Sequence, residues 1–412
     1  MKLAQGGRTM AKRLLVFSAV FCAATVFASF TEVETMPAAQ RRGLKTFSAT
    51  YPLDVGNYDV TFTFGDETKP TESWVKFEGR RIALEKITTK PGEKRKVAFT
   101  ARVKGPIMKA DAPTGEAPFP YALNLTVITS ADAVAEPEIK KNESARVIYL
   151  CGDSTVTDQQ GEPWGSWGQC LPIFFKEGAA VANFAKSGLH TTSFRKEGRL
   201  ERILASLKAG DVVVIQFGHN DQKQKWLAPQ DGYKGELADY IAKIKEKGAE
   251  AVIISPMERL RFDRRSGAQQ PKTLADYAQA AREVAEAGGV PFIDLNDASY
   301  KMYGALGAQN ATRLFCTATI EEQVRDYFGE NSRVPRKNMR NIADKTHHSI
   351  YGAYVLAHYI ADKLAEALAY LAPLRREGYI AAAADAVEDD PEIPPSGIID
   401  TRRPEGDTGN KE

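Results

Sequence analysis

Cysteine is scarce in this sequence, which has four in 412 residues. Cys22 lies in an apolar segment near the N-terminus, and the other three are Cys151, Cys170 and Cys316. Three cysteines cannot all pair within one chain, so the sequence shows no disulfide framework. The spacing of cysteine and histidine matches no metal-binding pattern either, and we therefore expect no metal site.

A strong net charge is absent as well. Lysine and arginine number 55 against 53 for aspartate and glutamate, which gives a net charge of +2 and a pI near 8.1. This balance provides no basic field, so we expect no nucleic-acid partner. With 43% hydrophobic and 26% charged residues, the composition is that of a soluble globular protein of two or three domains.

An apolar run from Leu14 to Phe27 follows a basic segment at the N-terminus. It is too short and too early for a membrane-spanning helix, and small residues stand where a cleavage site needs them. We therefore expect a signal peptide over residues 1–28, cut after Ala28, and a secreted or periplasmic protein without stable membrane insertion. The bulky Phe21 before Cys22 disfavours a lipoprotein.

Residues 45–130 have the pattern of an all-β domain. Tyr58, Val60, Phe62 and Phe64 alternate with polar residues, which predicts a half-buried strand. Similar runs over 74–87, 96–103 and 122–129, separated by turn residues, favour a small β-sandwich accessory domain. This part has no cluster of catalytic residues, and the polar residues 131–145 are interpreted as a linker.

Residues 146–374 alternate apolar strands with helical patterns. The expected strands are 147–151, 179–184, 211–217, 251–255 and 290–295, and the expected helices are 196–207, 235–247, 273–287 and 351–371. This alternation predicts a three-layer α/β/α sandwich around a five-stranded parallel sheet. The remaining residues, 375–412, are acidic and proline-containing and are expected to be disordered.

Polar residues follow several of the expected strands. Gly152 ends the first strand and permits a turn that projects Ser154. Gly188 and Asn220 follow the next two strands, and Asp344 stands three residues before His347, ahead of the last helix. The carboxyl ends of parallel strands meet at one edge, so these groups can share a pocket. Each residue alone is explained equally well as a turn or helix-cap residue, but four such placements together indicate a hydrolytic site.

These blocks resemble the SGNH (GDSL-type) hydrolase superfamily, with its flavodoxin-like fold. The resemblance rests on Gly152-Asp153-Ser154, Gly188, Gly218-His219-Asn220-Asp221 and Asp344-x-x-His347. The stretches Gly165-Ser166-Trp167-Gly168-Gln169 and Glu258-Arg259-Leu260-Arg261-Phe262-Asp263 make the rhamnogalacturonan acetylesterase family the most similar branch. That family implies hydrolysis of acetyl esters on a pectic backbone.

The chain departs from the family pattern in two places. Gly188-Leu189-His190 stands where relatives often have Gly-Arg-Ser, and residues 316–343 are longer than a minimal version of the fold. Both differences concern the substrate more than the chemistry.

The resemblance assigns roles to the polar residues. His347, held by Asp344, would deprotonate Ser154, and the oxyanion would be bound by the N–H groups of Ser154 and Gly188 and by the Asn220 amide. This chemistry requires neither a metal nor an organic cofactor.

Three further residues are candidates for substrate binding. Trp167 could stack on a sugar, or instead pack the first helix of the α/β domain. Arg259 and Arg261 could bind galacturonate carboxylates, or instead belong to a solvated charge cluster.

The sequence thus favours a secreted serine esterase that removes acetyl groups from a plant cell-wall polysaccharide, and the family resemblance implies that this polysaccharide is rhamnogalacturonan. The expected partner is an acetylated polysaccharide or oligosaccharide. Two alternatives stay open: an SGNH esterase acting on another acetylated glycan such as xylan, and a non-catalytic glycan-binding protein. The intact set of Ser154, Asn220, Asp344 and His347 weighs against the second. The sequence gives no indication of oligomeric state.

Overall fold

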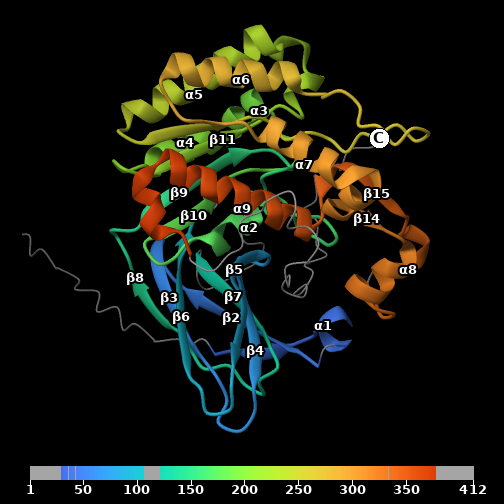
Figure 1. The fold of residues 1–412 in the computed structure, drawn as a ribbon. Coiled ribbons are helices and arrows are strands. Elements are labelled where there is room, and N and C mark those ends of the chain that lie inside the picture. Colours follow the sequence, from blue (N-terminus) through green and yellow to red (C-terminus); the bar gives the residue numbers. More distant parts are fainter. Residues whose placement is uncertain (1–28, 36, 42, 106–120, 333, 377–412) are drawn as a thin grey trace, which may run out of the picture.

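The computed structural model describes residues 29–376, except residues 36, 42, 106–120 and 333. The expected signal peptide and residues 377–412 of the expected tail lie outside the described residues. Figure 1 shows the arrangement of the chain, with the β-rich N-terminal part below and the α/β part above.

An eight-stranded sheet runs through the molecule. Five neighbouring strands, from β13 to β10, are parallel, and they correspond to the five that the sequence predicts. The strands in sheet order are β13 (Phe292–Ile293), β12 (Glu250–Ile254), β11 (Val212–Gln216), β9 (Arg146–Gly152), β10 (Ala179–Asn183), β6 (Arg95–Val103), β3 (Gly56–Phe64) and β8 (Glu138–Lys141).

Helices cover both faces of the parallel strands (Figure 1). Successive side chains of a strand point to opposite faces, so Ile148 and Leu150 enter one apolar core while Val147 and Tyr149 enter the other. The first core is closed by α2 (Trp167–Cys170), α7 (Leu295–Asn310) and α9 (Ile350–Ala367). The second is closed by α3 (Thr191–Lys196), α4 (Arg199–Ser206), α5 (Lys234–Glu246) and α6 (Ala275–Gly288).

The N-terminal part contains a second sheet, which is antiparallel. It faces β3 and β6 across a core that includes Phe62, Phe99 and Val127. The single strand expected over 74–87 is two strands, because the chain turns at Glu78 and Gly79, where φ is positive. The strands in order are β1 (Thr31–Val33), β2 (Lys45–Pro52), β7 (Ala122–Thr129), β4 (Thr71–Phe77) and β5 (Arg81–Thr89).

The two parts of the chain are joined more closely than the sequence predicts. β6 pairs in parallel with β10, with Thr100 opposite Ala180, so one sheet crosses the expected domain boundary. The residues interpreted as a linker, 131–145, contain β8, which pairs with β3. Alternation within a strand shows which face is buried, but it does not show which strands pair at the edge of a sheet.

Buried cations of the N-terminal part also hold the α/β part. Arg81, fully buried, donates from Nε and Nη2 to Asp158 Oδ2 at 2.8 and 2.6 Å. Arg80 donates to the carbonyls of Gln159 and Trp164 at 2.7 and 3.1 Å, and Lys104 donates to the carbonyl of Asn183. The segment that follows Ser154 is therefore fixed by side chains from a different part of the sequence.

A two-stranded sheet, which the sequence analysis did not predict, precedes the last helix. It consists of β14 (Phe315–Ala318) and β15 (Ile342–His348), which are antiparallel. The Asp344-to-His347 motif therefore lies on a strand rather than in a loop.

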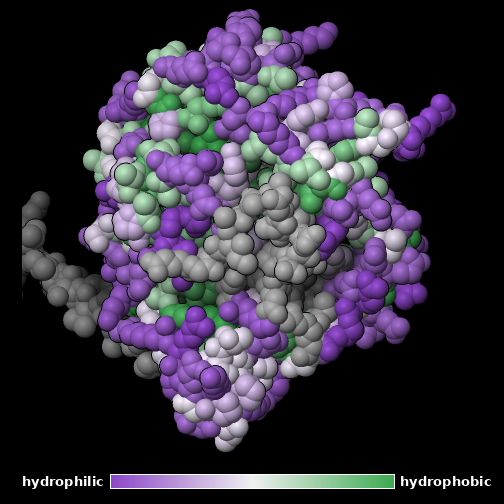
Figure 2. Space-filling view, viewed as in Figure 1, coloured by the Kyte–Doolittle hydropathy of each residue, from purple (hydrophilic) through white to green (hydrophobic). Residues whose placement is uncertain are grey.

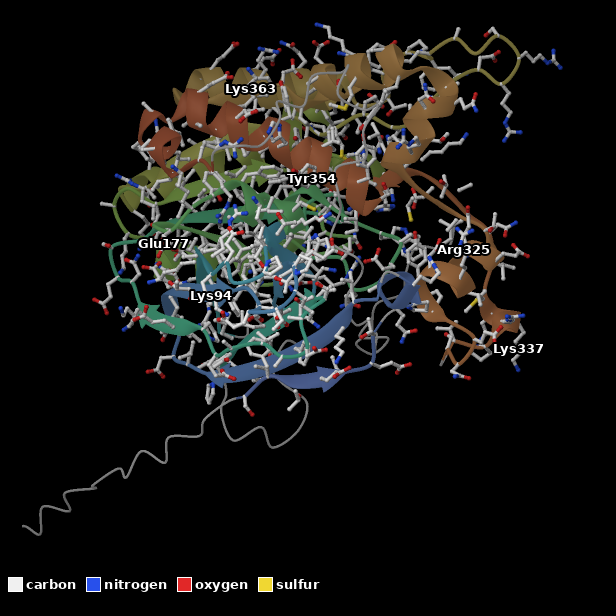
Figure 3. The ribbon with its side chains drawn as sticks, turned by 60° about the horizontal axis from the view of Figure 1, so that its bottom comes forward. Lys94, Glu177, Arg325, Lys337, Tyr354 and Lys363 are labelled. Atoms are coloured by element: carbon white, nitrogen blue, oxygen red, sulfur yellow. The ribbon has the colours of Figure 1, made fainter. Side chains whose placement is uncertain are left out.

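The residues between β14 and β15 include α8 (Ile320–Glu322) and extend to the edge of the molecule. Arg41, at the end of α1 (Pro37–Arg41), pairs there with Asp326 at 2.6 Å. Figure 3 shows Arg325 and Lys337 of this segment well apart from Tyr354 of α9.

None of the helices in the described part of the chain is long and apolar enough to span a membrane. Cys151, Cys170 and Cys316 are buried and unpaired. They serve as small apolar core residues.

His348 is buried at the end of β15 and provides a test of the packing there. Its ring lies 4.5 Å from that of Phe315, and its Nε2 is 2.9 Å from the Tyr303 hydroxyl. Burial lowers the pKa of His348 to about 3. Below pH ~6.5 the unfolded chain binds a proton at this position that the folded chain does not.

We therefore expect the free energy of unfolding to fall as the pH drops from about 6.5 toward 3, with His348 contributing up to ~1.4 kcal/mol per pH unit. His348→Gln, which keeps a partner for Tyr303, should unfold in urea with a shallower dependence on pH. Equal pH slopes for the two proteins would show that His348 is protonated in the folded state.

Candidate active site

Ser154 stands in a tight turn at the end of β9, which lies between β11 and β10 in the parallel part of the sheet. A Cβ atom at Gly152 would lie 2.4 Å from Cγ2 of Val156, so no residue larger than glycine fits at this position. The backbone N–H groups of Val156 and Thr157 donate to the carbonyl of Asp153 at 3.1 and 3.0 Å. Ser154 is half-buried between buried neighbours.

Three side chains form a continuous hydrogen-bonded chain at this turn. Ser154 Oγ lies 2.8 Å from His347 Nε2, and His347 Nδ1 lies 2.8 Å from Asp344 Oδ2. A carboxylate only accepts, so Nδ1 carries the proton and Nε2 is left as the acceptor for the serine hydroxyl. This is the arrangement that lets a histidine act as a base toward serine.

Asp344 is held by its own strand. Its Oδ1 accepts from the backbone N–H groups of Thr346 and His347 at 2.8 and 2.9 Å. Burial raises the pKa of Asp344, but the hydrogen bonds and the charge of His347 outweigh it and hold that pKa well below its usual range. The carboxylate is therefore charged at neutral pH and can stabilise an imidazolium.

The two neighbouring histidines face opposite ways because they lie on a strand. His347 points to Ser154, whereas His348 points into the core toward Tyr303. The structure thus agrees with the sequence in bringing Ser154, Asp344 and His347 together. The strand that orients them was missed, because the polar residues of β15 lack an apolar alternation.

Gly188 and Asn220 follow the two strands that flank β9. Gly188 has an exposed backbone with φ of +83°. Asn220 is buried, and its Nδ2 donates to the carbonyl of Leu189 at 3.0 Å. An amide nitrogen carries two hydrogens, so the second can be aimed at a substrate oxygen. Because β10 and β11 are the neighbours of β9, the loops that carry both candidate donors follow strands next to the strand of Ser154.

A buried carboxylate, Asp221, supports these loops, although the sequence analysis assigned it no role. Asp221 accepts from the backbone and hydroxyl of Thr191 at 3.0 and 2.7 Å and from the backbone of Gly218 at 3.0 Å. It therefore ties the loop after β11 to the start of α3. In the sequence, the signal that could have identified Asp221 is its position in the Gly218-to-Asp221 motif.

His219 and Asp153, the residue before Ser154, are buried side by side. His219 Nδ1 is 3.9 Å from Asp153 Oδ2, and neither atom has a hydrogen-bond partner among the described residues. Burial, followed by the charge of Arg259, lowers the pKa of His219 well below its ordinary value. Because the imidazole is neutral, His219 adds no charge to the site.

Trp167 does not reach the site, and its prediction as a sugar contact is wrong. The ring is 1% exposed and its Nε1 donates to Gln216 Oε1 at 2.7 Å. The residue packs α2 against the sheet, because that short helix is buried on all sides. A buried ring has no face to offer to a ligand.

The predicted arginines lie on the loop after β12, which reaches the triad. The backbone N–H of Leu260 donates to the carbonyl of Lys345 at 2.9 Å, next to Asp344. Arg261 is exposed, while Arg259 is half-buried and donates to Thr273 Oγ1 at 2.9 Å.

This loop lines a hollow of about 560 Å³ that carries a strong positive charge. Figure 1 shows the segment between β12 and α6 extending from the body of the molecule in yellow, and Figure 2 shows a hydrophilic projection at the same place. The polar lining consists of Arg259, Arg261, Arg264, Arg265, Lys345, Gln270 and a single acid, Asp263. The hollow is suited to anionic groups.

Among the described residues, no three His, Cys, Asp or Glu side chains are grouped closely enough to hold a metal ion.

Comparison with known proteins places this geometry in a family. The model of the GDSL-like lipase/acylhydrolase family matches residues 150–314, which include Ser154, Gly188 and Asn220 but not Asp344 and His347. The chain is 35% identical over 221 residues to rhamnogalacturonan acetylesterase RhgT of Bacillus subtilis, covering 53% of this chain and 89% of that protein.

A second relative is the rhamnogalacturonan acetylesterase of Emericella nidulans, 29% identical, with 42% of this chain and 76% of that protein covered. Among solved structures, protein YxiM of Bacillus subtilis is 24% identical with a TM-score of 0.46, covering 78% of this chain and 80% of that one. The length and identity of the RhgT match show that the chain belongs to the GDSL-like lipase/acylhydrolase family and is a carboxylic ester hydrolase.

Proposed function

We propose that the chain is an exported serine esterase that removes acetyl groups from a plant cell-wall polysaccharide, with rhamnogalacturonan as its preferred substrate. The observation that carries the proposal is the hydrogen-bonded chain from Ser154 through His347 to Asp344, with both links at 2.8 Å. Relatives named rhamnogalacturonan acetylesterase support the choice of substrate.

The first half of the reaction acylates the serine. Ser154 Oγ attacks the acetyl carbonyl carbon while its proton passes to His347 Nε2. The carbonyl oxygen becomes an oxyanion, which the N–H groups of Ser154 and Gly188 and the Asn220 amide bind. When the tetrahedral intermediate collapses, the bond to the sugar oxygen breaks and His347 returns the proton to that oxygen. Acetyl-Ser154 and a free sugar hydroxyl result.

The second half regenerates the enzyme. Water attacks acetyl-Ser154 while His347 accepts one of its protons, and the same donors bind the second oxyanion. Collapse of this intermediate releases acetic acid, which ionises, and restores the Ser154 hydroxyl with the proton from His347. Asp344 stays ionised and holds the imidazole in one tautomer throughout.

The cationic hollow after β12 is the feature that favours a pectic substrate. Galacturonate residues carry a carboxylate on each ring, which guanidinium groups bind in a bidentate manner. Neutral acetylated xylan offers no such group. Export is supported by the basic and apolar segments at the N-terminus, and N-terminal sequencing of the mature protein tests it, with Ser29 expected first.

The central test measures acetate release from acetylated rhamnogalacturonan, from neutral acetylated xylan and from a small chromogenic acetate ester. We expect the pectic polymer to be the better of the two polysaccharides. Ser154→Ala should lose activity on all three, because no nucleophile is left, while its circular dichroism stays that of the wild type. His348→Gln is the matched control at neutral pH, since its ring points away from Ser154.

Turnover by Ser154→Ala within a few-fold of wild type would remove this serine from the nucleophile role. Equal rates on the two polysaccharides would leave the ester hydrolysis standing and defeat the pectin assignment.

The amide of Asn220 provides a separate test of oxyanion binding. Asn220→Ala should lower kcat on the small ester by about a hundredfold or more, the scale of a single oxyanion donor. Gln222→Ala is the control, because Gln222 lies on the same turn and its side-chain amide donates to the carbonyl of His219 at 3.1 Å. An unchanged kcat in Asn220→Ala would exclude this amide from the oxyanion hole.

The arginine loop is tested by Arg261→Ala, which removes an exposed guanidinium without disturbing the bond between Arg259 and Thr273. KM for the pectic polymer should rise roughly three- to tenfold and the effect should shrink with added salt, whereas the small neutral ester should be unaffected. Arg336→Ala, an exposed arginine of the 316–343 segment, is the charge-matched control. The same KM in both variants would show that the hollow does not bind substrate.

A further inference from the structure

Trp226 is the most exposed large hydrophobic residue of the described chain. Its exposed fraction is 62%, and Val55, at 40%, is the one other large hydrophobic residue among the described residues that is classed as exposed. A fully covered aromatic side chain buries roughly 150–250 Å², so a ligand that covers the exposed part of Trp226 gains binding free energy from the area that it removes from water.

The backbone that carries Trp226 is fixed. The next residue, Leu227, is 1% exposed, and its carbonyl accepts from the Tyr277 hydroxyl at 2.9 Å. Two short helical turns connect Trp226 to Asn220. The backbone N–H of Lys223 donates to the carbonyl of Asn220 at 3.1 Å, and that of Leu227 donates to the carbonyl of Gln224 at 3.0 Å. The ring is therefore held in solvent by an ordered loop, which lowers the entropy cost of binding against it.

His190 lies beside the indole. The two ring centroids are 6.3 Å apart and the rings are nearly perpendicular, at 77°. His190 Nδ1 accepts from the backbone of Ser193 at 3.3 Å, so the proton of the neutral ring is on Nε2, which is a donor. Burial, followed by the charge of Lys196, lowers the pKa of His190 and keeps the ring neutral. The pair thus offers an apolar face with one hydrogen-bond donor.

Trp226 and His190 lie on the loops that also carry the candidate oxyanion donors Asn220 and Gly188. His190 follows Leu189, whose carbonyl accepts from the Asn220 amide at 3.0 Å. The backbone N–H of Lys223 donates to the carbonyl of Asn220 at 3.1 Å, so Lys223 lies on the turn that begins at Asn220. Trp226 is three residues beyond Lys223.

Two exposed lysines, Lys223 and Lys225, precede the ring in sequence, and neither forms an ion pair with any of the described residues. Positive charges beside an aromatic face suit a sugar that carries a carboxylate. The cationic hollow after β12 lies toward Lys345, whereas Trp226 and His190 border Gly188 and Asn220, so the two surfaces adjoin different parts of the site.

We propose that Trp226 and His190 form a subsite on which a uronate-bearing sugar ring stacks, next to the acetylated sugar held at Ser154. The apolar C–H face of the pyranose covers the indole, His190 Nε2–H donates to a ring hydroxyl, and the lysines attract the carboxylate. This subsite rests on the proposed action on an acidic polysaccharide. It uses His190 at the place where relatives often carry another residue.

Binding is measured without turnover in the Ser154→Ala chain by titrating a deacetylated rhamnogalacturonan oligosaccharide. Intrinsic fluorescence is the readout, since Trp74 and Trp167 are buried, Trp164 is half-buried and Trp226 is the exposed indole, and Trp226→Phe separates the signal of Trp226 from that of Trp164. We expect a blue shift and protection from acrylamide quenching, both lost in Ser154→Ala with Trp226→Phe. Calorimetry should show at least a fivefold higher Kd for Ser154→Ala with Trp226→Ala, and no change for Ser154→Ala with Val55→Ala.

In the otherwise native enzyme, Trp226→Ala should raise KM for the acetylated polymer by the same factor and leave turnover of a small acetate ester unchanged. A neutral xylo-oligosaccharide that binds as well as the pectic one would defeat the uronate assignment. An unchanged Kd and KM in Trp226→Ala would overturn the subsite while acetate release leaves the proposed function intact. If the wild type releases no acetate from any polysaccharide but Trp226-dependent binding persists, the proposed function fails and the subsite stands.

Discussion

A side chain at residue 152 has no room, because its Cβ would approach Val156 to 2.4 Å, and the chain at the end of β9 can turn sharply only with glycine there. That turn fixes Ser154 at the end of β9, between the neighbouring strands β11 and β10. Every other part of the site has to come to it: His347 from 193 residues further along the chain, and Asn220 from the neighbouring strand end. The position of one backbone turn therefore determines where the remaining catalytic groups must lie.

Three carboxylates lie near Ser154, and their surroundings give them different tasks. Asp344 accepts two backbone N–H bonds and the imidazole, which keeps it charged beside the base. Burial raises the pKa of Asp153, and it raises that of Asp221 to about 7. Asp221 instead bonds Thr191 and Gly218 and holds loops in place. Asp344 and Asp221 each accept three hydrogen bonds, but of the three carboxylates it is Asp344 that accepts from the imidazole of His347 and so serves the chemistry.

Much of the α/β part could be predicted from the sequence, because strands buried on both faces require continuous runs such as Val212 to Gln216, and motif spacing pointed to Ser154, Asp344 and His347. Other features depend on contacts between distant residues. The parallel pairing of Thr100 with Ala180 joins the two parts at a sheet edge that no local pattern marks. Trp167 and Trp226 look alike in the sequence, yet tertiary packing buries the first and exposes the second.

The continuity of the large sheet has a consequence for modular engineering. A cut made at the expected boundary near residue 145 would expose the edge of β10 and leave Asp158 without the guanidinium of Arg81. An unpaired edge strand invites association with other chains, and a carboxylate that has lost its buried partner is costly. The N-terminal strands are therefore a covalently attached part of the esterase scaffold, and grafting the catalytic residues onto another carrier would have to bring these strands with them.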